Sequence, residues 1–277
     1  MANLKSSPLG PYVGEEIHGL DLSRPLAPET IDELRGILAN RGVIFLRDQD
    51  LTPEQQVAFA ARFGEVHVNP YFTAVSGHPQ VAEVRKEAND RQNIGEVWHT
   101  DNSYYPAPAL GSILYAKEIP PIGGDTLFAS MYAAYDALSD GLKRTLESMR
   151  AVHSTAQVFG ATGTAVTQGL NGIRPSDKLP EATHPVVITH PQSGRKALYV
   201  NASFTTCFEG WTPQESAPLL NFLYEHGRRP EFQCRFRWQK GSLAFWDNRA
   251  TWHYAANDYH GHRRLMHRVQ VEGTPLH

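Results

Sequence analysis

The chain has 277 residues, of which 41% are hydrophobic and 20% charged, and its formal net charge is −3. These values are typical of a folded globular protein and argue against a surface for nucleic acid or anionic membranes. The chain lacks the run of about 18 apolar residues that a membrane span needs, and no apolar run follows its N-terminus as in a signal peptide. With two cysteines and no Cys-x-x-Cys pair, the expected location is the cytoplasm.

The first part of the chain predicts a strand, a helix, a strand and a second helix. Apolar residues at helical spacing predict a helix over Pro28–Asn40. The apolar run Val43–Leu46 predicts a strand that is buried on both faces. The segment Thr52–Gln55 supplies an N-cap, a proline at the first helical position and a capping-box glutamine, so a second helix is expected to begin there and to stop at Gly64.

Short strands dominate the rest of the chain, and turn residues separate them. Further helices are expected after Ser130, over Leu142–Met149 and after a second capping box at Thr212–Glu215. Many short strands with flanking helices predict a β-sandwich or jelly roll. The expected strands are Val81–Arg85, a strand through His99, Ser112–Ala116, a strand after the Gly123–Asp125 turn, Val186–Thr189, Ala197–Val200, and strands around Phe232–Trp238, Ser242–Trp246 and Arg268–Val271.

The segment between Phe159 and Pro180 interrupts this pattern. Its composition changes to glycine, alanine, threonine and polar residues, and no hydrophobic periodicity survives. A long segment of this kind inside a compact domain is typical of a lid over a site. We therefore expect a single domain over residues 1–277 with a lid insert around 160–179.

The segment Trp98–Asn102 contains the first pair of candidate metal ligands. His99 and Asp101 lie two residues apart, so in an extended strand both side chains would point to the same face. An imidazole and a carboxylate placed in this way are two of the three ligands of a mononuclear ferrous site, the 2-His-1-carboxylate facial triad. Because His-x-Asp also occurs by chance in a chain with 13 histidines, the interpretation depends on a third ligand.

We choose His253 as that third ligand, since it follows the aromatic-to-polar segment Phe245–Arg249. The alternative is a core histidine that hydrogen-bonds to the backbone. Arg264, eleven residues further on, favours the metal site, because a dicarboxylate cosubstrate that chelates iron needs a fixed cation at its far carboxylate. Eleven residues are a workable span if the strands that carry His253 and Arg264 are neighbours across a hairpin. Thr126 would add a hydroxyl donor to the same carboxylate.

Three arginines near the C-terminus could instead form a solvated basic strand. On a regular strand Arg264 and Arg268 share one face and Arg263 lies on the other, so Arg263 is the one expected in solvent. Two buried cations need two anions. The cosubstrate would supply one and the primary substrate the other.

These segments together resemble the taurine dioxygenase and phenoxyalkanoate-herbicide dioxygenase family, whose members are Fe(II)/2-oxoglutarate-dependent oxygenases. The resemblance runs nearly end to end, with the motifs in the same order. It rests on Leu9–Tyr12, Phe45–Gln49, His99–Asp101, Gly123–Thr126, Trp246–Arg249, His253, Arg264, Arg268 and Val271–Gly273.

The resemblance implies a mainly β fold with flanking helices, the double-stranded β-helix or jelly roll. It also implies Fe(II) as the metal, with 2-oxoglutarate and O2 as cosubstrates. By the same resemblance, the metal ligands are His99, Asp101 and His253, the 2-oxoglutarate residues are Thr126 and Arg264, and the residue that meets the anionic group of the substrate is Arg268.

The expected substrate pocket departs from the taurine pattern. Asn69 stands where taurine enzymes have a histidine, Phe72 replaces a tyrosine, and Asn102 replaces a small apolar residue. Phe159 and Phe204 match aromatic pocket positions, although core aromatics would give the same pattern. Together with Arg268, these five residues are the substrate-binding candidates.

We therefore expect a dioxygenase that hydroxylates a small organic anion, of the sulfonate, sulfate ester or aryloxyalkanoate type, while 2-oxoglutarate is decarboxylated to succinate. One alternative is a metal-dependent hydrolase with the same His/Asp/His site, in which Arg264 and Thr126 would have no role. Another is a jelly-roll protein that binds without catalysis. A homo-oligomer, dimer or tetramer, is also expected, with no nucleic-acid or membrane partner.

Overall fold

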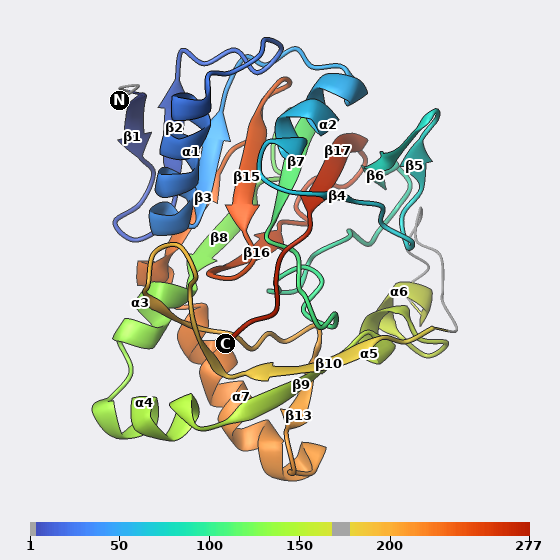
Figure 1. The fold of residues 1–277 in the computed structure, drawn as a ribbon. Coiled ribbons are helices and arrows are strands. Elements are labelled where there is room, and N and C mark those ends of the chain that lie inside the picture. Colours follow the sequence, from blue (N-terminus) through green and yellow to red (C-terminus); the bar gives the residue numbers. More distant parts are fainter. Residues whose placement is uncertain (1–3, 168–177) are drawn as a thin grey trace.

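A large sheet spans the upper part of the molecule, as seen in Figure 1, in the computed structural model, which describes residues 4–167 and 178–277. Its neighbouring strands run antiparallel, except for one parallel pair near the N-terminus. In sheet order the strands are β1 (Lys5–Pro8), β2 (Glu15–His18), β3 (Val43–Leu46), β15 (Leu243–Asp247), β7 (Gly111–Glu118), β17 (Arg264–Val271), β6 (His78–Lys86) and β5 (Ala74–Val75), while β4 (Val66–His67) pairs with β17.

A smaller antiparallel sheet packs on the inner face of the large one. Phe45 of the large sheet lies flat against Phe236 of the smaller sheet, with ring centroids 4.1 Å apart, and meets Phe128 edge-on at 5.5 Å. The two sheets therefore enclose one aromatic-rich core, which is the arrangement of the predicted jelly roll. In order, the strands of the smaller sheet are β14 (Gln233–Phe236), β8 (Thr126–Ser130) and β16 (Thr251–Ala255).

Two helices cover the outer face of the large sheet (Figure 1). Helix α1 (Pro28–Arg41) ends at Gly42, whose φ of 71° closes the helix in the left-handed conformation. Helix α2 (Pro53–Ala61) begins with a reciprocal capping box between Thr52 and Gln55. Apolar side chains of both helices share a buried cluster with β3, β7, β15 and β17. Both helix predictions are confirmed.

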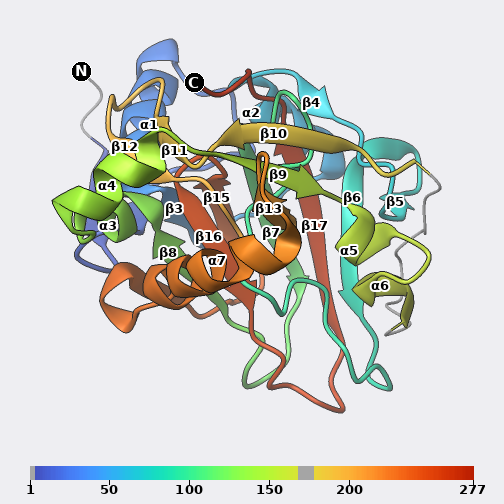
Figure 2. The same cartoon turned by 90° about the horizontal axis from the view of Figure 1, so that it is seen from below.

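A layer of helices and short strands closes the other end of the molecule, where α7 crosses beneath the sheets (Figure 2). Helix α7 (Pro213–Gly227) begins with the second predicted capping box, between Thr212 and Glu215. None of the described helices is long and apolar enough to cross a membrane. The remaining elements are α3 (Met131–Asp136), α4 (Asp140–Glu147), β9 (Arg150–Ser154), α5 (Ala156–Phe159), α6 (Thr164–Thr167), β10 (Glu181–Pro185), β11 (Val187–Thr189), β12 (Lys196–Leu198), β13 (Thr205–Phe208) and the 3-10 helix η1 (Pro230–Phe232).

The strands that carry His253 and Arg264 do not meet that condition, because they are not neighbours across a hairpin. Strand β16 pairs with β8 in the smaller sheet, whereas β17 lies between β7 and β6 in the large sheet. The chain changes sheets between the two strands, so the two side chains face each other across the core instead of lying side by side. The predicted lid around 160–179 includes α6. Residues 168–177 of that predicted lid lie outside the described residues.

Candidate active site

The candidate metal ligands come from two separate segments. His253 lies in the middle of β16, and His99 forms an isolated antiparallel bridge to it, with backbone N···O distances of 3.1 and 2.8 Å. Asp101 lies in the turn that follows, so the predicted strand through His99 and Asp101 is wrong. Asn102 adopts a left-handed φ of 58°, a conformation that asparagine tolerates better than most residues. The bridge fixes His99, and the turn brings the carboxylate back toward it.

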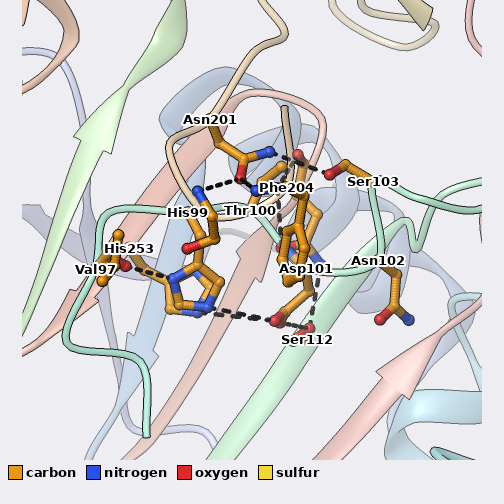
Figure 3. A network of polar contacts seen from close by, with 12 residues as sticks. Val97, His99, Thr100, Asp101, Asn102, Ser103, Ser112, Asn201, Phe204 and His253 are labelled. Carbon is orange, nitrogen blue, oxygen red and sulfur yellow. Dashed lines mark hydrogen bonds and ion pairs between the residues drawn. The ribbon is translucent and has the colours of Figure 1, made fainter. Parts of the chain in front are cut away.

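The three predicted ligands converge on one point (Figure 3). Asp101 Oδ1 lies 3.7 Å from His99 Nε2 and 4.0 Å from His253 Nε2, and all three side chains are buried. One ligand atom from each residue lies within 4.8 Å of the other two. These separations are too long for hydrogen bonds, but they leave room for one ion at metal–ligand distances of about 2.0–2.2 Å.

The protonation states of the cluster suit a divalent metal. His99 Nδ1 lies 2.7 Å from the carbonyl oxygen of Val97, so this nitrogen donates and Nε2 keeps its lone pair. Burial lowers the pKa of His99 and lowers the pKa of His253 well below its ordinary value, which keeps both rings neutral. Burial alone would raise the pKa of Asp101, but the charge of Arg268 opposes it and the pKa falls to about 2. Two neutral imidazoles and one carboxylate are the donor set of a ferrous facial triad.

A hydrogen-bond network holds the turn that carries Asp101. Ser112 Oγ donates to Asp101 Oδ2 at 2.7 Å (Figure 3). Asn248 Oδ1 accepts from Asp101 N at 3.2 Å. Asn248 Nδ2 donates to Ser112 at 3.1 Å, and Trp246 Nε1 donates to Asn248 Oδ1 at 2.9 Å. Sequence reasoning missed the role of Ser112. The available signal was a serine that begins an otherwise apolar strand.

Thr126 and Arg264 lie beside the metal cluster, as predicted. Thr126 Oγ1 accepts a hydrogen bond from Trp238 Nε1 at 2.9 Å, so its own proton is free to donate. Both residues line a cavity of about 40 Å³. The other residues around that cavity are Val84, Ile94, Gly95, His99, Leu114, Trp246, His253, Ala255 and Arg268.

Arg264 is a buried cation that forms no ion pair with any carboxylate among the described residues. Its side chain is 3% exposed, and neither Nε nor Nη2 has a hydrogen-bond partner. Burial lowers the pKa of Arg264, yet a guanidinium stays protonated in proteins. Leaving such a group unpaired is costly. The orphaned guanidinium, the Thr126 hydroxyl and the nearby ligand cluster therefore fit a dicarboxylate such as 2-oxoglutarate, with one end at the metal and the other at Arg264.

Arg268 lies where this cavity adjoins a larger one of about 230 Å³. Its Nη1 is 3.5 Å from Asp101 Oδ1, and its Cζ is 4.2 Å from the centre of the Phe72 ring. Its Nε is buried and has no partner among residues 4–167 and 178–277. All six predicted substrate residues line the larger cavity, namely Asn69, Phe72, Asn102, Phe159, Phe204 and Arg268.

Sequence reasoning did not single out several other residues of the larger cavity. Tyr104 was the easiest to find, because it lies three residues after Asp101 and is aromatic like the predicted pocket wall. The others that it missed are Asn93, Ile94, Gly95, Glu96, Val97, Val158, Thr164, Ser203 and Tyr254.

Arg263 takes the position predicted for it. Its side chain is 35% exposed and pairs with Glu87, at 3.0 Å, and with Glu118. The alternation along β17 therefore separates a partly solvated arginine from the two buried ones. The reading of all three as a solvated basic strand is wrong.

Comparisons with known proteins agree with this geometry. Residues 5–270 match the model of the family described as "Taurine catabolism dioxygenase TauD, TfdA family". An alkylsulfatase from Acinetobacter baylyi is 35% identical over 94% of this chain and 82% of its own length. The alpha-ketoglutarate-dependent 2,4-dichlorophenoxyacetate dioxygenase of Cupriavidus pinatubonensis is 32% identical over 90% of both chains.

A solved structure gives the same result. The crystal structure of a taurine dioxygenase from Burkholderia xenovorans superposes with a TM-score of 0.81 and 37% identity, covering 98% of this chain and 89% of that one. These similarities support the dioxygenase prediction and do not support the metal-dependent hydrolase. The chain belongs to the TauD/TfdA family of dioxygenases.

Proposed function

We propose that this protein is an Fe(II)/2-oxoglutarate-dependent dioxygenase that hydroxylates a small organic anion. The observation that carries the proposal is the buried guanidinium of Arg264, whose Nε and Nη2 have no partner in the described part of the chain, beside the buried cluster of His99, Asp101 and His253. A hydrolytic metal site would need the three ligands but would give no role to this cation. When bound, Fe(II) and 2-oxoglutarate supply the oxidising chemistry, in which R–H, 2-oxoglutarate and O2 yield R–OH, succinate and CO2.

The residues of the chain divide the work of binding and orientation. His99, Asp101 and His253 would hold the iron on one face and leave the other face open to ligands. Arg264 and Thr126 would fix the far carboxylate of 2-oxoglutarate. Arg264 lies on β17 of the large sheet and Thr126 on β8, next to β16 in the smaller sheet, so the far carboxylate would lie between the two sheets.

The larger cavity would hold the primary substrate. Arg268 would bind its anionic group, and the aromatic side chains of Phe72, Phe159 and Phe204 would exclude water and hold its carbon skeleton. Relatives are named for sulfate ester, sulfonate and aryloxyacetate substrates. We propose the same range of anions, with Asn69 and Asn102 as further polar residues in the wall of the cavity. We also propose a cytoplasmic location and a homo-oligomer, either a dimer or a tetramer. Light scattering would test the oligomeric state.

Anaerobic titration tests the reaction class. Addition of Fe(II) and then 2-oxoglutarate to the purified protein should produce a visible charge-transfer absorption, which a zinc hydrolase would lack. Succinate should then form in air with one or more of hexyl sulfate, taurine and 2,4-dichlorophenoxyacetate. If the absorption fails to appear while the protein is folded, the proposed function is wrong.

A further inference from the structure

The side chain that follows the metal-binding carboxylate is held in one orientation. Asn102 is 5% exposed and lines the larger cavity together with Arg268. The hydroxyl of Tyr104 donates a hydrogen bond to Asn102 Oδ1 at 3.0 Å. Among the described residues, no group accepts a hydrogen bond from the Asn102 amide nitrogen. Because Oδ1 is engaged, the free functional group of this side chain is a pair of N–H donors. Figure 3 places the side chain beside Asp101, on the same side of the turn.

Tyr104 is itself immobilised by aromatic packing. It is 2% exposed, and its ring meets Phe204 edge-on with centroids 4.9 Å apart. It also contacts Phe159 and Tyr71 edge-on, at 6.5 and 6.3 Å. These contacts fix the ring plane and hence the position of the hydroxyl. The orientation of Asn102 is therefore set by the same aromatic wall that lines the cavity.

Asn69 has a different environment, although it was predicted for a similar role. Its Nδ2 donates to Gln270 Oε1 at 2.8 Å, and its Oδ1 accepts from Tyr71 N at 2.9 Å. Gln270 in turn donates to Ser112 at 3.2 Å. Both ends of the Asn69 amide are thus engaged by the protein, whereas the nitrogen end of Asn102 is free.

We propose that Tyr104 is a positioning residue, and that it turns the Asn102 amide so that its N–H₂ donates to the oxyanion held by Arg268. The ligand class is an organic carboxylate, sulfonate or sulfate ester with at least two oxygens available. One oxygen meets the guanidinium and another meets the amide. Asn69 then braces Gln270 and the wall of the site. This inference rests on the proposed function, because it assigns a second donor to the same substrate.

Binding measurements on Asn102 variants test the donor. Calorimetry would follow hexyl sulfate and 2,4-dichlorophenoxyacetate binding to the protein loaded with Mn(II) and N-oxalylglycine, a non-reacting analogue of 2-oxoglutarate. Asn102→Gly fits the left-handed backbone and should weaken anion binding on the order of tenfold, as expected for a hydrogen bond to a charged group. Asn102→Asp keeps the acceptor for Tyr104 but replaces N–H₂ with a negative oxygen, so it should weaken binding further.

A double-mutant cycle tests the role of Tyr104. Tyr104→Phe removes only the hydroxyl and should weaken anion binding several-fold while leaving N-oxalylglycine binding unchanged. In the Asn102→Gly background the same substitution should have no further effect, because Tyr104 acts through Asn102. Tyr132→Phe is the matched control, since its buried hydroxyl donates to the Ala39 carbonyl at 2.9 Å far from the cavity.

The outcomes separate this inference from the proposed function. Asn102 also borders a second cavity, lined by His67, Tyr105 and Glu272 among others. If the amide faces that cavity instead, Asn102→Asp will leave anion affinity within about twofold of wild type, and the inference is overturned. Equal effects of Tyr104→Phe in both backgrounds would overturn the positioning role. If wild-type protein binds neither anion, the proposed function fails for these substrates, and the inference fails with it.

Discussion

Asp247 and Asp101 are both buried carboxylates with histidine and arginine neighbours, but their bonding differs. Asp247 accepts from Arg249 at 2.8 and 2.6 Å, and His190 Nε2 lies 3.0 Å away. Asp101 accepts at 2.7 Å from the neutral hydroxyl of Ser112, and its nearest charged or titratable neighbours lie 3.5–4.0 Å away. The first carboxylate has its hydrogen-bonding capacity filled by the protein, whereas the second leaves an oxygen directed at two imidazole nitrogens.

This difference separates a structural cluster from a binding site. A buried ion pair with full hydrogen bonding has nothing left to offer a ligand. His190 confirms this view, because its Nδ1 accepts from the backbone N–H of Ser193 at 3.1 Å and its Nε2 then donates to Asp247. Asp247 also lies next to Asn248, which supports the Asp101 turn. His190, Asp247 and Arg249 thus form a filled cluster, whereas His99, Asp101 and His253 form an unfilled one.

The largest expected effect comes from removing a ligand of the unfilled cluster. His99→Ala or Asp101→Ala should reduce the 2-oxoglutarate-dependent absorption and succinate formation to background, because two ligands do not retain the iron. Both variants should still fold, which separates loss of the metal site from loss of the structure. Absorption titration and urea unfolding would measure both. Full activity in either variant would show that the ligand assignment is wrong.

The filled cluster should respond in the opposite way. Asp247→Asn leaves the buried Arg249 uncompensated and should destabilise the protein by about 3–5 kcal/mol. The folded fraction should still give the 2-oxoglutarate-dependent absorption, because Asp247 does not contact the metal cluster. Urea unfolding at neutral pH measures the change. A variant as stable as wild type but unable to bind iron would reverse the two assignments.

The two buried arginines should separate cosubstrate from substrate. Arg264→Ala should weaken 2-oxoglutarate binding by about 2–5 kcal/mol, as for one partner of a buried charge pair. Arg268→Ala should leave that affinity nearly intact, raise the KM for the anionic substrate and increase succinate formed without hydroxylated product. Arg263→Ala is the control. The same defect in Arg264→Ala and Arg268→Ala would refute the assignment of two separate anions.

The smallest expected effect is the change with pH in the stability that the ionised Asp247 contributes to the folded protein. Burial alone would raise the pKa of Asp247, but Arg249 and then His190 outweigh it and hold this pKa well below its ordinary value. The stabilisation is therefore fully present above the unfolded-state pKa of about 3.9 and is lost as the pH falls toward the folded-state value. The stability gap between wild type and Asp247→Asn should stay constant from pH 8 to pH 5 and narrow only below about pH 4. If this difference in stability narrows near neutral pH, a group other than Asp247 is responsible for it.

Local features of the fold could be predicted because their causes lie within a few residues. The Thr52–Gln55 capping box and the apolar run Val43–Leu46 depend on neighbouring side chains and on periodicity, so both elements form where expected. The identity of the chemical groups was also readable, because an imidazole at 99, a carboxylate at 101 and a guanidinium at 264 are fixed by the sequence.

Tertiary structure alone decided how these groups meet. The bridge of His99 to His253 joins segments more than 150 residues apart. Between β16 and β17 the chain crosses from one sheet to the other instead of forming a hairpin. No local pattern records such pairings, because the partner strands come from distant parts of the chain. Tertiary structure also decided which side-chain amide keeps a hydrogen-bond donor for a ligand. Asn69 and Asn102 carry the same amide, and only their packed neighbours leave one engaged and the other free.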